Sequence, residues 1–278
     1  MSARKLAKTV YRALLIAFFA LVTAHVALDL GHPVWWDFLP LLLAYAVLVV
    51  ANRWGGAPDS PRAARPSVEV EPPVAGRWIA LNSPADHTPS HHTHAYGQTF
   101  AIDVVAEPEP GSRPPFRALW PVARRNADFP AHGAPLHAVA DATVVRATDT
   151  ARDHLSRGSL PALAYLMLLE ANVRDLLGAG RILGNHVVLD LGGGAYALYA
   201  HLRRGSLTVR EGDRVHAGQV LAQVGNSGNS TEPHLHFQLM DGPDPDTARG
   251  IRFTWRGIGV PRNNEVFEVP ARSVGARA

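Results

Sequence analysis

The sequence predicts a mainly β domain built on an antiparallel sheet, preceded by two N-terminal transmembrane helices and interrupted by a helical insertion. Three observations support this fold class. Short β-rich runs recur through residues 77–278, two long apolar runs lie near the N-terminus, and one helix-like segment separates the β-rich runs. At 278 residues the chain is long enough for one substantial core with appendages.

The two apolar runs cover residues 13–30 and 33–51. Each has close to the minimum length of a membrane-spanning helix. A cleavable signal peptide ending near residues 22–24 is an alternative. The second run follows so closely that a membrane-anchoring helical hairpin over residues 1–54 is the favoured interpretation, with membrane lipid as its partner.

Residues 55–76 are rich in Pro, Ala, Arg and Glu without a periodic apolar pattern, which predicts a linker. The soluble domain then covers residues 77–278. The triplet at residues 192–194 is all glycine and predicts a hairpin turn, because glycine adopts positive φ without steric cost. Strands are expected at the β-rich runs 100–105, 140–147, 186–191, 195–201, 220–224 and 234–239.

Two segments depart from the β pattern. Residues 107–135 are rich in Pro, Arg and aromatic residues and predict a long loop. Residues 159–178 predict one helix that ends at Gly178, within a helical insertion at about 151–183. We expect it to pack over a sheet face. A substrate-facing lid or a membrane-surface contact is the alternative.

Composition excludes several function classes. A net charge of +3 and a pI near 9.5 favour anionic envelope polymers or lipid only weakly. No basic stripe accompanies a nucleic-acid reading motif, so no nucleic-acid partner is expected. The sequence contains no Cys, and any metal site must therefore use His and carboxylate ligands.

Histidines supply the most informative motif. His234 and His236 alternate along a predicted strand, so they project from the same face, about 7 Å apart. That arrangement suits a metal ligand beside a proton-handling neighbour. Upstream lie His201 in Tyr-Ala-His-Leu, and a histidine cluster at residues 90–94 followed by Asp103 on another predicted strand.

In this order the motifs resemble the lysostaphin/LytM-type zinc metallopeptidases, which cut peptide bonds in bacterial peptidoglycan. The resemblance is densest from Gly184 to Gln238 and continues more thinly back to about Arg77. It implies an antiparallel β-sheet core of the LytM/lysostaphin type. It also implies Zn²⁺ as cofactor, and peptidoglycan stem peptides or cross-links as substrate.

The resemblance also implies roles for individual residues. Asp103 and His236 match two zinc ligands, and His201 and His234 match the two histidines that handle the proton and stabilise the oxyanion. The third ligand is less regular, because Thr99 stands where the common form of the first motif has its histidine. An extended-spacing form, Ser-His-x-Thr, favours His91 as that ligand. His94 is the alternative.

Two further positions depart from the family pattern, Glu232 where glycine is usual and Gln238 where glutamate is usual. Glu232 is expected to narrow or charge the groove. The alternative function is a catalytically weak or inactive LytM-like domain that binds cell wall or regulates another hydrolase. A biotinyl or lipoyl carrier role is excluded, because no Lys follows Lys8.

The basic residues and the implied substrate predict opposite membrane topologies. Basic residues precede the first apolar run and Arg53 follows the second, while the link between the runs has no Lys or Arg. For a hairpin, the positive-inside rule places both ends in the cytoplasm. A peptidoglycan hydrolase must face outward, and we expect the peptidase domain to be extracytoplasmic.

Overall fold

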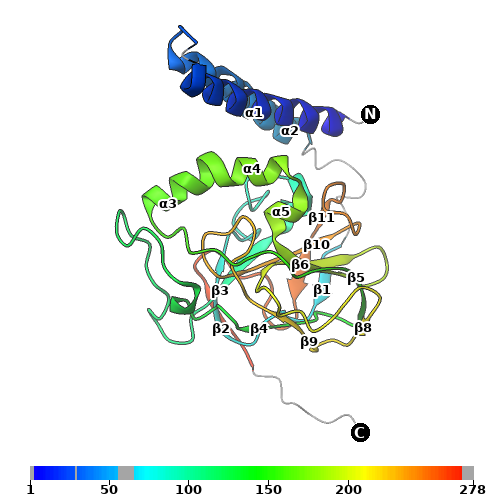
Figure 1. The fold of residues 1–278 in the computed structure, drawn as a ribbon. Coiled ribbons are helices and arrows are strands. Elements are labelled where there is room, and N and C mark those ends of the chain that lie inside the picture. The colour runs from blue at the N-terminus through cyan, green and yellow to red at the C-terminus, as the bar shows by residue number, and fades with distance from the viewer. Residues whose placement is uncertain (1–2, 29, 56–65, 271–278) are drawn as a thin grey trace. The chain divides into compact units, whose positions relative to one another are not determined.

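The computed structural model describes residues 3–28, 30–55 and 66–270. They fall into two compact units, Met1–Ala63 and Ala64–Ala278. The first unit contains helix α1 (Ala3–Leu28), the 3-10 helix η1 (Val34–Phe38) and helix α2 (Leu39–Gly55), and α1 packs against α2 (Figure 1).

Among the described residues, one helix is long and apolar enough to cross a membrane, Thr9–Leu28. The second apolar helix, Val34–Val50, is shorter. It comprises η1 and most of α2; the whole of α2 has 17 residues, and at about 1.5 Å per residue it is about 25 Å long, less than the roughly 30 Å of a bilayer core. The prediction of two transmembrane helices is therefore not confirmed, and one candidate span remains. A signal sequence near the N-terminus would have the same length and apolar character.

The second unit is mainly antiparallel β-sheet, as predicted. A nine-stranded sheet has the order β13-β2-β3-β10-β7-β6-β5-β8, with β11 paired to β10. Its strands are β2 (Gly76–Leu81), β3 (Ile102–Ala106), β5 (Ala142–Thr148), β6 (Asn185–Asp190), β7 (Tyr196–Leu202), β8 (Arg214–Val215), β10 (Leu235–Met240), β11 (Gly250–Ile251) and β13 (Val266–Val269).

Two smaller strand pairs complete the unit. β4 (Pro135–His137) pairs with β9 (Val220–Gln223), and β1 (Val68–Val70) runs parallel to β12 (Phe253–Trp255). β1 lies within the stretch predicted to be a linker. Val70 at the end of β1 pairs with Trp255, and both Val70 and the following Val74 are buried in the main core. Residues 56–65 of the predicted linker lie outside the described residues.

The two faces of the large sheet bury different sets of side chains. Alternating residues of β3, β10 and β7, such as Ile102, Phe237 and Tyr199, belong to the main core. Side chains alternate across a strand, so Asp103 and His236 face the other side. A smaller apolar cluster occupies that side, formed by Leu183, Val188, Leu198, Ala200, Met240 and Ala248.

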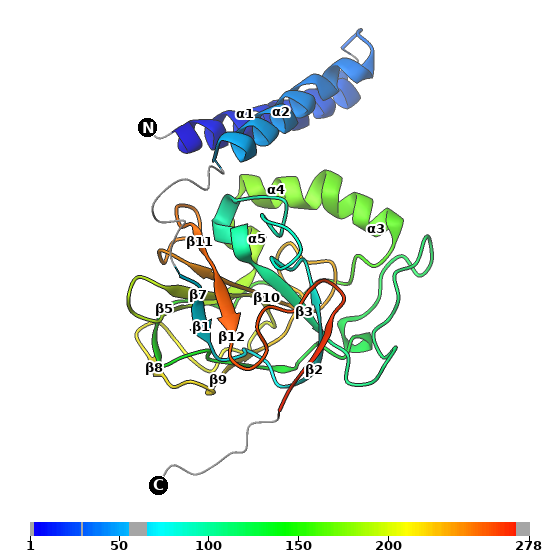
Figure 2. The same cartoon turned by 180° about the vertical axis from the view of Figure 1, so that it is seen from behind.

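The helical insertion is present within the predicted bounds. It comprises α3 (Leu160–Tyr165), the π-helical turn η4 (Leu166–Glu170), α4 (Ala171–Leu176) and α5 (Ala179–Leu183). The Ser159 hydroxyl caps its start by accepting from the Ala162 amide, and Gly178 with a φ of 98° separates α4 from α5. In Figures 1 and 2, α3 and α4 run along one side of the unit.

The predicted turn and long loop are also present. Residues 192–194 join β6 to β7, and all three glycines have positive φ. Residues 107–134 contain only one short helical turn, η3 (Asn126–Asp128).

Candidate metal centre

Three side chains from separate segments converge on the face of the sheet that carries the smaller apolar cluster. Asp103 is the second residue of β3, and His236 is the second residue of β10, directly opposite it in the antiparallel register. Figure 2 shows β3 beside β10. His91 comes from the loop before the 3-10 helix η2 (Ala95–Phe100). One ligand atom from each of the three lies within 4.8 Å of the others.

The contacts to Asp103 are specific. Nδ1 of His236 lies 2.8 Å from Oδ1 of Asp103, and Nε2 of His91 lies 3.0 Å from Oδ2. The Asn82 amide donates to Oδ2 at 2.7 Å. The carboxylate is buried, with only 6% of the residue exposed.

Outer hydrogen bonds decide which nitrogen of His236 faces inward. The Gln238 side-chain amide donates to the Tyr96 carbonyl at 2.7 Å, which turns Oε1 of Gln238 toward His236. Nε2 of His236 lies 2.9 Å from that oxygen and must donate to it. The Nδ1 lone pair therefore points toward Asp103.

His91 is arranged in the same way. The Ser90 hydroxyl donates to the Ala101 carbonyl at 2.6 Å and so accepts from Nδ1 of His91, 3.1 Å away. The Nε2 lone pair then faces Asp103. Two imidazole lone pairs and a carboxylate repel one another unless a cation or a proton lies between them. Two imidazoles and a carboxylate, each with outer hydrogen bonds, form a donor set that can hold a divalent metal ion.

Charge and burial oppose each other in this cluster. Burial alone would raise the pKa of Asp103, but nearby His91 and His234 outweigh it and hold that pKa well below its usual range. Burial lowers the pKa of His91, and Asp103 offsets this only in part. The aspartate is therefore a carboxylate and His91 is neutral at neutral pH, the states that metal binding requires.

His234 and His201 lie beside these three residues. Nδ1 of His234 donates to the Glu232 carbonyl at 2.8 Å, and its Nε2 is 3.6 Å from Oδ1 of Asp103. Nδ1 of His201 lies 2.8 Å from the Ser227 carbonyl. The two rings are 4.8 Å apart between centroids. Each ring directs Nδ1 outward, so both Nε2 atoms face the site, where Nε2 of His234 also lies near Asp103.

The backbone turns His201 toward the site. Neighbouring residues on a strand normally face opposite sides. Ala200 lies in the smaller apolar cluster, on the same face as the metal centre, so a regular strand would turn His201 away from that face. His201 has a φ of 61°, and β7 is bulged at this point, because Ala200 and His201 together oppose the single residue between Asn185 and Val187 of β6. A bulge re-aims a side chain in this way. The His201 ring consequently lies 5.7 Å from that of His236.

The two histidines differ in protonation. Burial holds the pKa of His201 well below 6.5, helped by His234 and His236. Burial also acts to lower the pKa of His234, but the charge and hydrogen bond of Asp103 outweigh it and raise that pKa above 6.5. At neutral pH the His201 ring is therefore neutral, and His234 carries a proton more readily.

The remaining sequence-predicted residues lie apart from the centre. Nδ1 of His94 lies 3.0 Å from Oγ1 of Thr99, and His94 is not among the three converging groups. The structure brings His91, and not His94, together with Asp103 and His236. Glu232 forms an ion pair with Arg113, so its charge is neutralised locally.

Several contributors were not recognised in the sequence. Asn82 follows β2 without any motif that marks it. Ser90 was part of the Ser-His-x-Thr signal, although only the structure shows its bond to His91. Tyr96 acts through its carbonyl, which no sequence pattern reveals.

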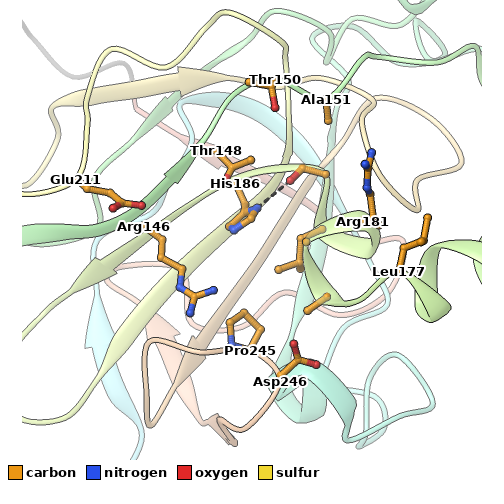
Figure 3. Close-up of a pocket in the computed structure, with 14 residues that line it drawn as sticks. Arg146, Thr148, Thr150, Ala151, Leu177, Arg181, His186, Glu211, Pro245 and Asp246 are labelled. Atoms are coloured by element: carbon orange, nitrogen blue, oxygen red, sulfur yellow. Dashed lines mark hydrogen bonds between the residues drawn. The ribbon is translucent and has the colours of Figure 1, made fainter. Parts of the chain in front are cut away.

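A pocket of about 560 Å³ lies between β5, β6 and the insertion. Figure 3 shows His186 in it, with Arg146 and Arg181 as cations and Glu211 and Asp246 as acids. His186 precedes Val187, which belongs to the main core. Because side chains alternate along a strand, His186 faces the other side of the sheet, as the metal centre does. β6 is the second strand from β10, roughly 10 Å away. Because this pocket is lined by both cationic and acidic side chains, it can bind a polar group that carries a positive or a negative charge.

Residues 170–246 match the profile of Peptidase family M23. The glycyl-glycine endopeptidase ALE-1 of Staphylococcus capitis is 52% identical over 42 residues, which cover 15% of this chain and 11% of that protein. The peptidoglycan DD-endopeptidase ShyA of Vibrio cholerae is 39% identical over 57 residues, which cover 20% and 13%. The matches thus span little more than about a tenth of these relatives.

Similar solved structures include the catalytic domain of lysostaphin from Staphylococcus simulans. It is 20% identical with a TM-score of 0.31, over 55% of this chain and 77% of that one. A mutant catalytic domain of the prophage-encoded M23 protein EnpA from Enterococcus faecalis is 20% identical with a TM-score of 0.29, over 51% and 95%. TM-scores this low carry no argument about function.

Proposed function

Because residues 170–246 match Peptidase family M23 and the motifs resemble those of lysostaphin/LytM-type peptidases, we propose that this chain is a zinc-dependent metalloendopeptidase. Its substrate would be the peptide bonds of bacterial peptidoglycan, in stem peptides or cross-links. The observation that carries this proposal is the convergence of His91, Asp103 and His236 beside two further histidines. The two curated relatives above are named as endopeptidases.

His91, Asp103 and His236 would hold the zinc ion through Nε2, a carboxylate oxygen and Nδ1. Zinc bound there would polarise the scissile carbonyl and acidify a water molecule. The outer bonds from Gln238 and Ser90 keep the ligand nitrogens in the required tautomers.

We assign His201 as the proton acceptor and His234 as the proton donor. The lowered pKa of His201 keeps its Nε2 free to take a proton from the attacking water. His234 would stabilise negative charge on the carbonyl oxygen and supply a proton to the leaving amine. The bond to the Glu232 carbonyl holds the His234 ring in place for either step.

The chain would be anchored in the cell membrane by Thr9–Leu28, with its peptidase domain outside. A single span resolves the conflict with the basic residues. Arg4, Lys5 and Lys8 precede that helix and would remain in the cytoplasm, as the positive-inside rule requires, while everything after Leu28 emerges outside. An inactive, wall-binding domain is not favoured, because every residue type that hydrolysis needs is present at the centre.

Digestion of purified peptidoglycan tests the proposal. The soluble segment from residue 64 to 278 is suitable because β1 belongs to the domain core. It should release soluble fragments with new amino and carboxyl termini within peptides, as read by mass spectrometry. A chelator should stop the release and zinc should restore it. Binding to peptidoglycan without cleavage in the presence of zinc would favour the regulatory alternative.

A further inference from the structure

The N-terminal helical unit contains a second group of metal-type ligands. His25 lies near the end of α1, His32 lies in the link that follows, and Asp37 lies in η1. One ligand atom from each lies within 4.8 Å of the other two. The imidazole rings of His25 and His32 are 5.2 Å apart between centroids. These residues are distant in sequence from the centre described above and take no part in it.

Asp37 is the group that most needs a partner. It is 1% exposed, and neither of its carboxylate oxygens accepts a hydrogen bond from the described residues. A buried carboxylate without hydrogen bonds or a counter-charge is strongly destabilising. Among the described residues, no Lys or Arg forms an ion pair with Asp37. Compensation must therefore come from the two histidines or from a cation held with them.

The geometry of His25 and His32 favours a bound cation. Nδ1 of His25 approaches Oδ2 of Asp37 to 2.9 Å, yet this nitrogen makes no hydrogen bond in the described structure. A simple histidine–aspartate ion pair would direct an N–H at the oxygen. Nδ1 of His32 lies 3.3 Å from the Pro33 carbonyl, and by donating to it leaves the Nε2 lone pair facing Asp37, 3.7 Å from Oδ1. A backbone bond that fixes the outer nitrogen is typical of metal-binding histidines.

We propose that His25, His32 and Asp37 form a second metal site, which binds a divalent transition metal ion such as Zn²⁺. Two imidazole nitrogens and one carboxylate oxygen suit zinc and its neighbours, whereas calcium and magnesium prefer all-oxygen sites. The ion would tie the end of α1 to η1 and so fix the turn that leads into α2. This inference does not depend on the peptidase proposal.

Zinc stoichiometry of the full chain in detergent tests the second site. After equilibration with zinc and removal of the excess, the unaltered chain should retain two zinc ions. Asp37→Asn and His32→Gln should each retain one, His236→Ala should retain one, and the Asp37→Asn/His236→Ala double variant none. In the His236→Ala background, Co²⁺ should give a visible absorption band that His25→Ala abolishes.

His216→Ala is the matched control. His216 is an exposed histidine that lies 3.6 Å from Asp141 without another ligand, so its loss should leave two zinc ions. His32 is partly exposed, so His32→Gln gives a result even where Asp37→Asn loses its helical circular dichroism signal. One zinc ion in the unaltered chain and in His32→Gln, with none in His236→Ala, would show that the second cluster is an ion pair only. Two ions retained in His236→Ala would instead contradict the first site.

Discussion

Nε2 of His236 lies 2.9 Å from Oε1 of Gln238, and this contact determines which nitrogen of His236 faces Asp103. The Tyr96 carbonyl fixes the Gln238 amide in turn. The glutamate that is usual at this position could accept the same bond from His236 but could not donate to Tyr96. Gln238 therefore preserves the ligand geometry while departing from the family pattern.

Replacement of Gln238 should test this relationship. Gln238→Leu removes the acceptor for Nε2 of His236, and we expect zinc affinity to fall about 10- to 100-fold. Gln238→Glu keeps the acceptor and should stay closer to the unaltered affinity. Competition with a colorimetric chelator measures both. Equal zinc affinities for Gln238→Leu and the unaltered domain would mean that the hydrogen bond between His236 and Gln238 does not strengthen zinc binding.

The choice between His91 and His94 gives a second prediction. His91→Ala should lose metal as Asp103→Ala does, because both remove a converging ligand. His94→Ala should stay mostly metallated, since His94 contacts Thr99 instead. Zinc content per chain after gel filtration decides between them. Loss of metal from His94→Ala with retention in His91→Ala would move the third ligand to His94.

Acid should destabilise the peptidase domain partly through His186. Burial lowers the pKa of His186 below 6.5. As the pH falls below 6.5, the unfolded chain therefore binds a proton that the folded chain resists, and the free energy of unfolding decreases. One such group contributes at most about 1.4 kcal/mol per pH unit, and nothing well above pH 6.5.

Urea unfolding between pH 7.5 and 5.5 measures this contribution. His186→Gln retains an amide that can donate to the Gly184 carbonyl but does not titrate in this range. Its unfolding free energy should depend less on pH than that of the unaltered domain. The metal-site histidines contribute equally to both proteins and cancel in the comparison. An identical pH dependence would contradict the inferred burial of a neutral His186.

The outward topology gives a further prediction. Protease added to intact spheroplasts should digest the domain after residue 64, because Thr9–Leu28 would hold it on the outer side of the membrane. A cytoplasmic marker protein must remain intact as the control. Protection of the domain until the membrane is broken would place it in the cytoplasm, away from any peptidoglycan.

Parts of this structure were predictable because local patterns decided them. The alternation of Leu235, His236 and Phe237 places one histidine on the face opposite the main core, and glycines at residues 192–194 fix a hairpin. The position of His201 was less predictable, because a positive φ and a bulge in its own strand turn it toward the site.

Other features depend on tertiary packing that sequence patterns do not contain. Val70 and Val74 lie in a Pro-rich stretch and are nevertheless core residues, and Val70 is held there by the pairing of β1 with β12. The second apolar run was predicted to be one span, but a 3-10 helix occupies its start and shortens the α-helix. The motif spacing favoured His91 and left His94 as the alternative, because the loop between them and β3 includes left-handed residues such as His92 and Tyr96.

The most direct test of the central claim compares His236→Ala with His234→Ala in the segment 64–278. Zinc content and peptidoglycan hydrolysis are measured on the same preparations. His236→Ala should lose both zinc and hydrolysis, because it removes a ligand. His234→Ala should retain zinc and lose hydrolysis, because it removes only a proton-handling group. Equal zinc content in both variants with hydrolysis preserved would contradict the proposed metal centre and its mechanism.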